Sequence, residues 1–166
     1  MFSLDFRAEE RLAQLYVQVA GRSGRAEKQG EVVLQTHYPD HPLLTTLLEK
    51  GYQAFAEETL KLRHNMGLPP FSFQALFKAQ CRHSEEAENA LSQLASFFYE
   101  QKIEGLQVLG PIPAPFSKKA GQYRWQLLLQ HASRKQLQAA LSRYSPELIK
   151  SSQVRLILDV DPLDLS

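Results

Sequence analysis

The sequence has few of the residues that build disulfides, zinc sites or membrane spans. Cys81 is the single cysteine among 166 residues, so no internal disulfide can form, and no cysteine or histidine spacing matches a structural zinc site. No stretch reaches the roughly 18 apolar residues of a spanning helix, and charges interrupt the start of the chain before a signal peptide could form. We therefore expect a soluble, cytoplasmic protein with no metal site and no membrane contact.

Neither sign of charge dominates the chain. Lys and Arg number 19 against 18 Asp and Glu, which gives a formal net charge of +1 and no indication of an anionic partner. Hydrophobic residues make up 43% of the chain and charged residues 22%, a composition typical of a globular protein with a sizeable core. The length suits one domain, or one domain and a piece of a second.

The first 40 residues predict a helix, a basic turn and a strand. Apolar residues recur at helical spacing from Asp5 to Val19, and we expect this helix to end at Gly21. Residues 21–30 are rich in glycine, arginine and lysine and do not fit a core element. The run EVVLQT at residues 31–36 is typical of a strand buried on both faces.

Residues 41–70 predict a connecting helix and a turn. Apolar residues follow the helical period from Pro42 to about His64, with a bend expected near Gly51. Gly67 and the prolines at 69 and 70 then stop the helix.

From residue 71 onward, the hydrophobic pattern alternates between the periods of a strand and of a helix. Strands are expected at 72–81, 106–109, 122–131 and 153–160, and helices are expected to begin at the caps Ser84 and Ser133. Residues 111–115 read as a proline-rich connection. The order β-α-β-β-α-β predicts an α+β, ferredoxin-like domain at 71–166, with a four-stranded antiparallel sheet and two helices on one face.

The string QVAGRSGR at residues 18–25 is the most specific motif in the chain. Gly21 and Gly24 allow a tight turn. Arg22 and Arg25 carry permanently charged guanidinium groups, each of which can bind two phosphate oxygens at once. Spacing alone leaves a second interpretation open, in which a helix end is followed by a solvated basic turn.

With the following EVVLQT, this string resembles motif VI of superfamily 2 helicases. In that family the motif lies in the second RecA-like lobe and its arginines reach the phosphates of ATP. The resemblance implies that Arg22 and Arg25 are arginine fingers and that Gln18, Gly21 and Gly24 belong to the nucleotide-binding motif.

Further blocks of the chain resemble the replication-restart helicases of the PriA family: DFRAEERLAQLYVQVAGRSGR, GEVVLQTHYPDHPLL, LPPF, VLGPIPAP, YRWQLLLQH and LDVDP. The resemblance implies the end of a RecA-like lobe at residues 1–40, a connecting helix at 41–70 and an S10-like domain at 71–166. It also implies an ATP-dependent 3′–5′ DNA helicase that recognises stalled or branched forks and acts with other primosome proteins. ATP and Mg²⁺ are the implied cofactors, and zinc is bound elsewhere in the family.

The chain departs from this family in three respects. It has no GxxxxGK[ST] phosphate loop, no acidic DExx motif and none of the family's zinc-binding cysteines. We therefore expect the chain alone to have no ATPase activity. A free-standing, non-enzymatic module that binds nucleic acid or protein remains the alternative.

Charge is unevenly distributed, because residues 105–146 contain no Asp or Glu. We expect a flexible loop at 118–121 and a DNA-binding or partner-binding surface made of basic side chains, against the alternative that they are simply solvated. The candidates are Lys118, Lys119, Arg124, Arg134 and Lys135. Trp125 is interpreted as core in preference to a platform for unpaired bases in single-stranded or branched DNA.

The resemblance implies a second anionic partner, the acidic C-terminal tail of single-stranded DNA-binding protein, for which Arg134 is the candidate. The five histidines have no metal spacing and are interpreted as structural or solvated. Asp159 and Asp161 are interpreted as turn or ion-pair residues in preference to catalytic carboxylates.

Overall fold

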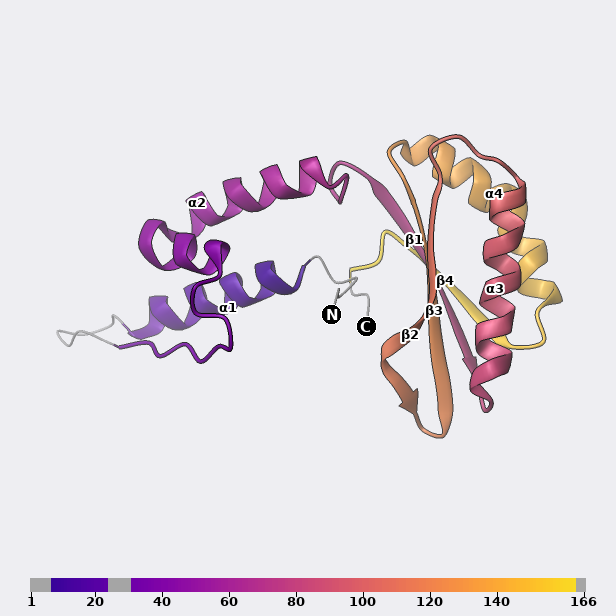
Figure 1. Ribbon diagram of the computed structural model, residues 1–166, viewed down its shortest axis with the longest axis horizontal. Helices are drawn as coiled ribbons and strands as arrows, with labels where there is room; N and C mark the ends of the chain where they lie inside the picture. Colours follow the sequence, from indigo (N-terminus) through magenta and orange to yellow (C-terminus); the bar gives the residue numbers. More distant parts are fainter. Residues whose placement is uncertain (1–6, 24–30, 164–166) are drawn as a thin grey trace. The chain divides into compact units, whose positions relative to one another are not determined.

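The computed structural model describes residues 7–23 and 31–163. These residues contain four helices and four strands, and the strands form one antiparallel sheet (Figure 1). The predicted α+β class is confirmed. The chain divides into two compact units, Met1–Met66 and Gly67–Ser166, which are described separately.

The first unit contains two helices, α1 at Ala8–Ser23 and α2 at Pro42–Asn65. The predicted bend of α2 is confirmed, because Gly51 has φ 84° and ψ −179° inside the helix. Within this unit, Ala13 of α1 packs with Leu43, Leu47 and Phe55 of α2 in a small buried cluster.

Two predictions for this unit are wrong. The first helix does not stop at Gly21 but runs on to Ser23, because a glycine inside a helix costs only about 1 kcal/mol and the backbone continues through it. Residues 31–36 form no strand, and Val33 is 84% exposed. A strand needs a neighbour for its backbone hydrogen bonds, and the described residues of this unit supply none.

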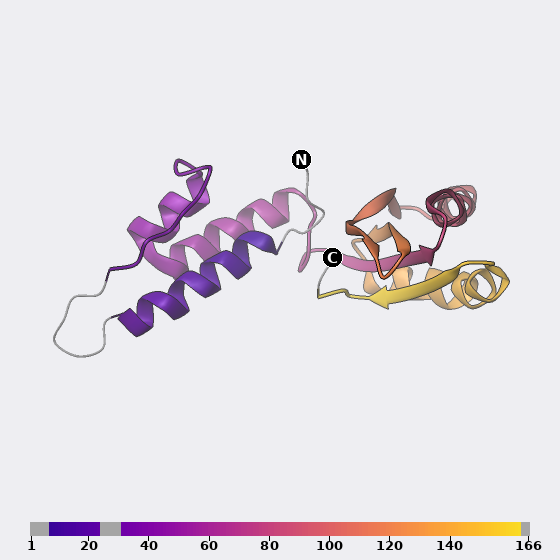
Figure 2. The same cartoon turned by 90° about the horizontal axis from the view of Figure 1, so that it is seen from below.

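The second unit has the element order β-α-β-β-α-β. Its sheet has the strand order β2-β3-β1-β4, and both helices lie on one face of it (Figures 1 and 2). The elements are β1 Phe73–Cys81, α3 Ser84–Glu100, β2 Gln107–Lys119, β3 Gln122–His131, α4 Arg134–Ser151 and β4 Arg155–Val160.

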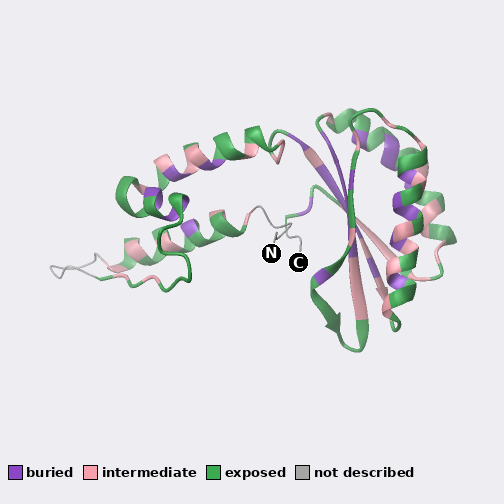
Figure 3. Ribbon diagram, in the orientation of Figure 1, coloured by how far each residue is buried: buried purple, intermediate pink, exposed green. Residues whose placement is uncertain are grey.

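The core of this unit lies between the sheet and the two helices, where the facing surfaces are buried (Figure 3). Phe77 of β1 and Leu127 of β3 are fully buried against Leu91 and Phe98 of α3. The Phe98 ring lies 6.1 Å from that of Phe77 and 6.3 Å from that of Tyr144. Because alternate strand residues point to opposite faces, this packing fixes which residues of each strand face away from the helices.

The second strand is longer than predicted. The sequence predicts a strand at 106–109 and then a proline-rich connection, but β2 extends through the prolines to Lys119. Its register shifts between Leu109 and Ile112 and again between Pro113 and Lys118. Proline is tolerated here because β2 is an edge strand. The register shifts also interrupt the pairing with β3 around the prolines, which have no backbone N–H to donate.

The expected flexible loop at 118–121 is a tight hairpin turn. Lys118 pairs with Tyr123 and Lys119 with Gln122, so Ala120 and Gly121 alone connect the strands. Their φ angles are 51° and 76°, as the favoured two-residue hairpin turn requires.

One of the two expected helix caps is confirmed. The Ser133 hydroxyl accepts a hydrogen bond from the Gln136 amide at the start of α4. At the start of α3 the cap is His83, without a side-chain cap bond. The Ser84 hydroxyl instead accepts a hydrogen bond of 2.9 Å from Trp125 Nε1, because strand β3 brings the indole to it.

Candidate nucleic-acid interface

The face of the sheet away from α3 and α4 carries a group of cations at one end. Gln80 of β1 pairs with Arg124 of β3 on one side and with Arg155 of β4 on the other. Cross-strand partners share a face, so the two arginines flank Gln80 in one row, about 10 Å apart across two strand spacings.

Lys119 extends this group toward the edge of the sheet. It pairs with Gln122, which lies two residues before Arg124 and therefore on the same face. We call Lys119, Arg124 and Arg155 the basic cluster. Lys119 and Arg155 are exposed and Arg124 is half-buried. Across the described residues 7–23 and 31–163, no carboxylate forms an ion pair with any of the three.

Among the described residues, the rest of this sheet face offers no positive charge without an acidic partner. The Lys78 amine lies 3.5 Å from the Asp159 carboxylate, which offsets its charge. Toward the other end, Leu76 and Leu128 are buried, and the amide of Gln74 donates to that of Gln130 at 2.6 Å. The positive potential is therefore concentrated at the basic cluster.

The chemistry of the basic cluster suits a backbone of phosphates. Two guanidiniums and an ammonium present donors from rigid strands, and guanidinium forks bind phosphate oxygens bidentately. A row of such groups neutralises successive phosphates, which supplies affinity without reading sequence.

The aromatic side chains of the β2–β3 hairpin differ from the expectation in one respect. Trp125 packs against the core and its indole nitrogen is bonded to Ser84, in agreement with its interpretation as a core residue. Phe116 of β2 is 68% exposed and can stack on an unpaired base. Sequence reasoning missed Phe116, although it lies two residues before Lys118 in a run of small and proline residues.

The structure does not bring the five predicted basic residues together. Arg134 and Lys135 begin α4, beyond the end of β3 at His131, which is about 23 Å along the strand from Arg124. Lys118 faces the helix side of the sheet, with its amine 3.3 Å from the Tyr123 hydroxyl. Sequence reasoning also missed Arg155, whose place beside Gln80 follows only from the sheet pairing.

Arg134 has a separate environment at the opposite end of the sheet. Its guanidinium lies 2.7 Å from an Asp161 carboxylate oxygen and 5.0 Å from the centre of the Phe73 ring. Its side chain remains 56% exposed. The expected ion-pair roles of Asp159 and Asp161 are confirmed by these contacts and by the Lys78 pair.

The candidate arginine-finger motif lies at the end of α1. Gln18, Gly21 and Arg22 are exposed, and Arg22 stands in the last turn of the helix. Gly24 and Arg25 lie outside the described residues. The chain's residues do not fit a complete ATP site, because the sequence lacks the phosphate loop and the carboxylates that hold Mg²⁺. The zinc that the resemblance implies for the family would need several cysteines, and the single thiol of this chain, Cys81, does not fit such a site.

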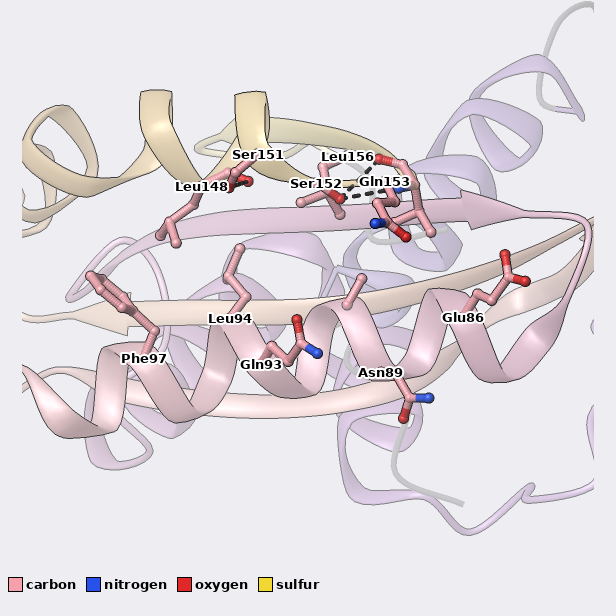
Figure 4. Close-up of a pocket in the computed structure, with 12 residues that line it drawn as sticks. Glu86, Asn89, Gln93, Leu94, Phe97, Leu148, Ser151, Ser152, Gln153 and Leu156 are labelled. Atoms are coloured by element: carbon pink, nitrogen blue, oxygen red, sulfur yellow. Dashed lines mark hydrogen bonds between the residues drawn. The ribbon is translucent and has the colours of Figure 1, made fainter.

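A groove of about 520 Å³ lies on the helix side of the same unit, between α3 and the segment that joins α4 to β4 (Figure 4). The Ser152 hydroxyl shapes one wall by hydrogen bonds to the backbone of Val154. Of the described residues that line the groove, Glu86 alone is charged, and a carboxylate is unsuited to binding a polyanion. The Cys81 thiol donates to Glu86 and lowers the pKa of its carboxyl, assisted by the imidazole of His83 and opposed by desolvation.

No helix in the described part of the chain is long and apolar enough to cross a bilayer.

Among the histidines, His131 has a structural role. Its Nδ1 accepts a hydrogen bond of 2.7 Å from the Ser133 amide, so Nε2 carries the proton and donates to the Glu104 carbonyl.

Comparison with known families decides where the chain belongs. The family described as Primosomal protein N C-terminal domain matches residues 64–163, which include every strand of the sheet. The chain belongs to this family. The Primosomal protein N C-terminal domain therefore contains both the basic cluster and Arg134.

Several proteins similar to this chain are named Replication restart protein PriA. The chain is 78% identical to that of Haemophilus influenzae over 100% of this chain and 23% of the relative. It is 33% identical to that of Synechocystis sp. over 97% of this chain and 19% of the relative, and 30% identical to that of Bacillus subtilis over 95% and 20%. The chain thus spans about a fifth to a quarter of the length of these relatives.

Proposed function

We propose that this chain is part of an ATP-dependent 3′–5′ DNA helicase that recognises stalled or branched replication forks and restarts replication with other primosome proteins. Membership of the Primosomal protein N family and the names of the relatives support this proposal. The strand order β2-β3-β1-β4 with α3 and α4 on one face supports an S10-like, ferredoxin-like assignment for the second unit. Residues 1–40 would be the end of a RecA-like lobe.

Within such a helicase, the second unit binds the phosphates of branched or single-stranded DNA. The observation that carries this function is the row Arg124, Gln80 and Arg155, where two guanidiniums share one sheet face without a carboxylate partner among the described residues. Lys119 lengthens the row, and Phe116 offers an exposed ring for an unpaired base. Strands hold these groups more rigidly than loops do, so little ordering is needed when DNA binds.

Salt dependence tests this function directly. We would titrate the 166-residue chain with a labelled fork at several salt concentrations, and compare it with the Arg124→Ala and Arg155→Ala variants. Each variant should bind more weakly, with the slope of log K against log salt reduced by about 0.7–0.9 for each phosphate that is no longer neutralised. Arg143→Ala is the matched control, because its guanidinium lies over the Tyr144 ring on α4, away from this face. Unchanged affinity and slope in both cluster variants would show that the basic cluster does not bind DNA.

A second partner, the acidic tail of single-stranded DNA-binding protein, suits Arg134. This arginine already pairs with a carboxylate, that of Asp161, while its side chain stays largely exposed. A peptide carboxylate can therefore take the place of Asp161 in a bidentate contact. Arg134→Glu should weaken binding of the acidic tail peptide and leave fork affinity unaltered, and equal tail affinity in wild type and variant would reject this placement.

The isolated chain is expected to have no ATPase activity, because it lacks the phosphate loop and the acidic Mg²⁺ ligands. In the longer parent, Arg22 and Arg25 would act as arginine fingers, and Arg22→Ala or Arg25→Ala should lower kcat for DNA-stimulated ATP hydrolysis by about 10³-fold. ATP turnover by the pure 166-residue chain would contradict the first expectation. An upstream reading frame without a phosphate loop would favour the alternative, a free-standing DNA-binding or protein-binding module.

A further inference from the structure

Three side chains with different metal-binding chemistry converge where β1 ends and α3 begins. The Cys81 thiol, a ring nitrogen of His83 and a carboxylate oxygen of Glu86 all lie within 4.8 Å of one another. Cys81 Sγ lies 2.9 Å from Glu86 Oε2, and His83 Nδ1 lies 3.0 Å from Glu86 Oε1. The carboxylate therefore stands between the thiol and the imidazole.

The chain path explains why these residues meet. Cys81 is the last residue of β1, His83 is the residue that caps α3, and Glu86 is in the first turn of that helix. A side chain at the third helical position reaches back toward the cap. The spacing C-x-H-x-x-E across a strand-to-helix junction thus directs all three donor groups to one point.

We propose that Cys81, His83 and Glu86 form a binding site for a divalent transition metal ion of the Zn²⁺ class. Thiolate, imidazole and carboxylate are the three ligand types that Zn²⁺ uses, and one sulfur donor favours it over Mg²⁺ or Ca²⁺. Donors bound to one tetrahedral Zn²⁺ lie about 3.3–3.6 Å apart. The thiol–carboxylate and imidazole–carboxylate distances of 2.9 and 3.0 Å lie just below that range, and movement of the exposed His83 and Glu86 side chains brings the three donors, all within 4.8 Å of one another, around one ion.

The site has three protein ligands and an open side. The His83 side chain is 74% exposed and that of Glu86 56% exposed, so water can supply a fourth ligand. As the ion binds, the Cys81 thiol releases its proton to solvent and the thiolate sulfur becomes the ligand. The thiolate and the carboxylate then balance the two charges of the ion.

This site is independent of the metal that the family resemblance implies. That zinc is bound by several cysteines, whereas Cys81 is the single cysteine of this chain. The site is also separate from the basic cluster, because Cys81 pairs with Tyr123 and so faces the helix side of the sheet. A bound ion would join the end of β1 to the first turn of α3.

Cobalt provides the test, because Co²⁺ bound to a thiolate absorbs in the near ultraviolet and a four-coordinate ion has strong visible bands. We would titrate the reduced 166-residue chain, free of any affinity tag, with Co²⁺ and then displace the ion with Zn²⁺. The expected result is a thiolate-to-cobalt band that disappears when Zn²⁺ is added. Absence of that band at excess Co²⁺ would overturn the proposal.

Variants locate the site. Cys81→Ser should abolish the thiolate band, and His83→Ala and Glu86→Gln should each weaken Co²⁺ binding by at least about tenfold. Glu85→Gln and His37→Ala are matched controls, a neighbouring exposed carboxylate and a histidine of the other unit, and should leave affinity unchanged. Far-ultraviolet circular dichroism checks that each variant is folded. Equal affinity in wild type and the three ligand variants, or an equal loss in the controls, would reject these residues as ligands.

Discussion

Lys118 and Lys119 are neighbours in the chain and lie on opposite faces of the β2–β3 hairpin. Lys118 pairs with Tyr123 on the helix side of the sheet, whereas Lys119 pairs with Gln122 on the face of Arg124. The sequence presents them as two equivalent lysines of one loop. The pairing register gives them different surroundings, so they form a natural matched pair for testing which face binds DNA.

Lys119→Ala should therefore weaken fork binding more than Lys118→Ala does. Without the Lys119 ammonium one phosphate is no longer neutralised, which should reduce the salt slope by about 0.7–0.9, whereas Lys118→Ala should leave the slope close to that of wild type. Fluorescence anisotropy with a labelled fork at several salt concentrations gives both slopes. The reverse order, with Lys118 the more sensitive position, would place the DNA on the helix side of the hairpin.

The hydrogen bond from Trp125 to Ser84 gives a second prediction. Ser84→Ala removes the acceptor of the indole N–H and should lower the free energy of unfolding by about 1 kcal/mol. Trp125 is the single tryptophan of the chain, so its fluorescence emission reports this change directly in the folded state. Ser96→Ala, an exposed position on the same helix, is the control and should alter neither emission nor stability. An emission spectrum identical to wild type in Ser84→Ala would contradict the bond.

Gln130 connects three strands through its side chain. Its amide accepts from Gln74 at 2.6 Å and donates to Gln107 and to the Gly67 carbonyl. Gln74 and Gln130 are both buried, so the loss of Gln130 leaves a buried amide without its acceptor.

We therefore expect Gln130→Ala to lower the free energy of unfolding by about 2–3 kcal/mol. Gln107→Ala should cost less than about 0.5 kcal/mol, because Gln107 is exposed and Gln130 keeps the Gly67 carbonyl as an acceptor. Urea denaturation followed by circular dichroism measures both values. If both variants lost the same free energy of unfolding, the buried Gln74–Gln130 hydrogen bond would contribute no more to stability than the Gln130–Gln107 hydrogen bond.

Much of the second unit could be predicted from sequence because its hydrophobic periods are local and strong. Alternation in residues 72–81 and the capping box at Ser133 led directly to β1 and to the start of α4. The extension of β2 through Pro111, Pro113 and Pro115 could not be predicted in this way, since proline usually ends a strand. It becomes possible only at a sheet edge, and the position of a strand in a sheet is a tertiary property.

The candidate interface was predictable in composition but not in arrangement. An acid-free stretch pointed to Arg124 and Lys119, yet it also included Arg134, which lies beyond the opposite end of β3. Arg155 belongs to a different part of the chain and joins the cluster only because β4 pairs with β1. Residues 31–36 illustrate the reverse case, in which β-branched residues form no strand because partners are absent from the described part of their unit.

Two glycines of the β2–β3 hairpin allow the cost of a positive φ angle to be separated from the cost of a steric clash. Gly110 and Gly121 have φ angles of 112° and 76°, which side chains rarely adopt. A Cβ at Gly110 would lie 2.9 Å from the Gln126 carbonyl oxygen, whereas a Cβ at Gly121 would meet nothing within 4 Å. Gly121→Ala thus carries the backbone penalty alone, about 1–2 kcal/mol. Gly110→Ala adds a clash with strand backbone that cannot rotate away, and should cost at least about 1 kcal/mol more than Gly121→Ala. Parallel urea denaturation of the two variants measures the difference, and equal costs would show that the β2 bulge moves freely away from β3.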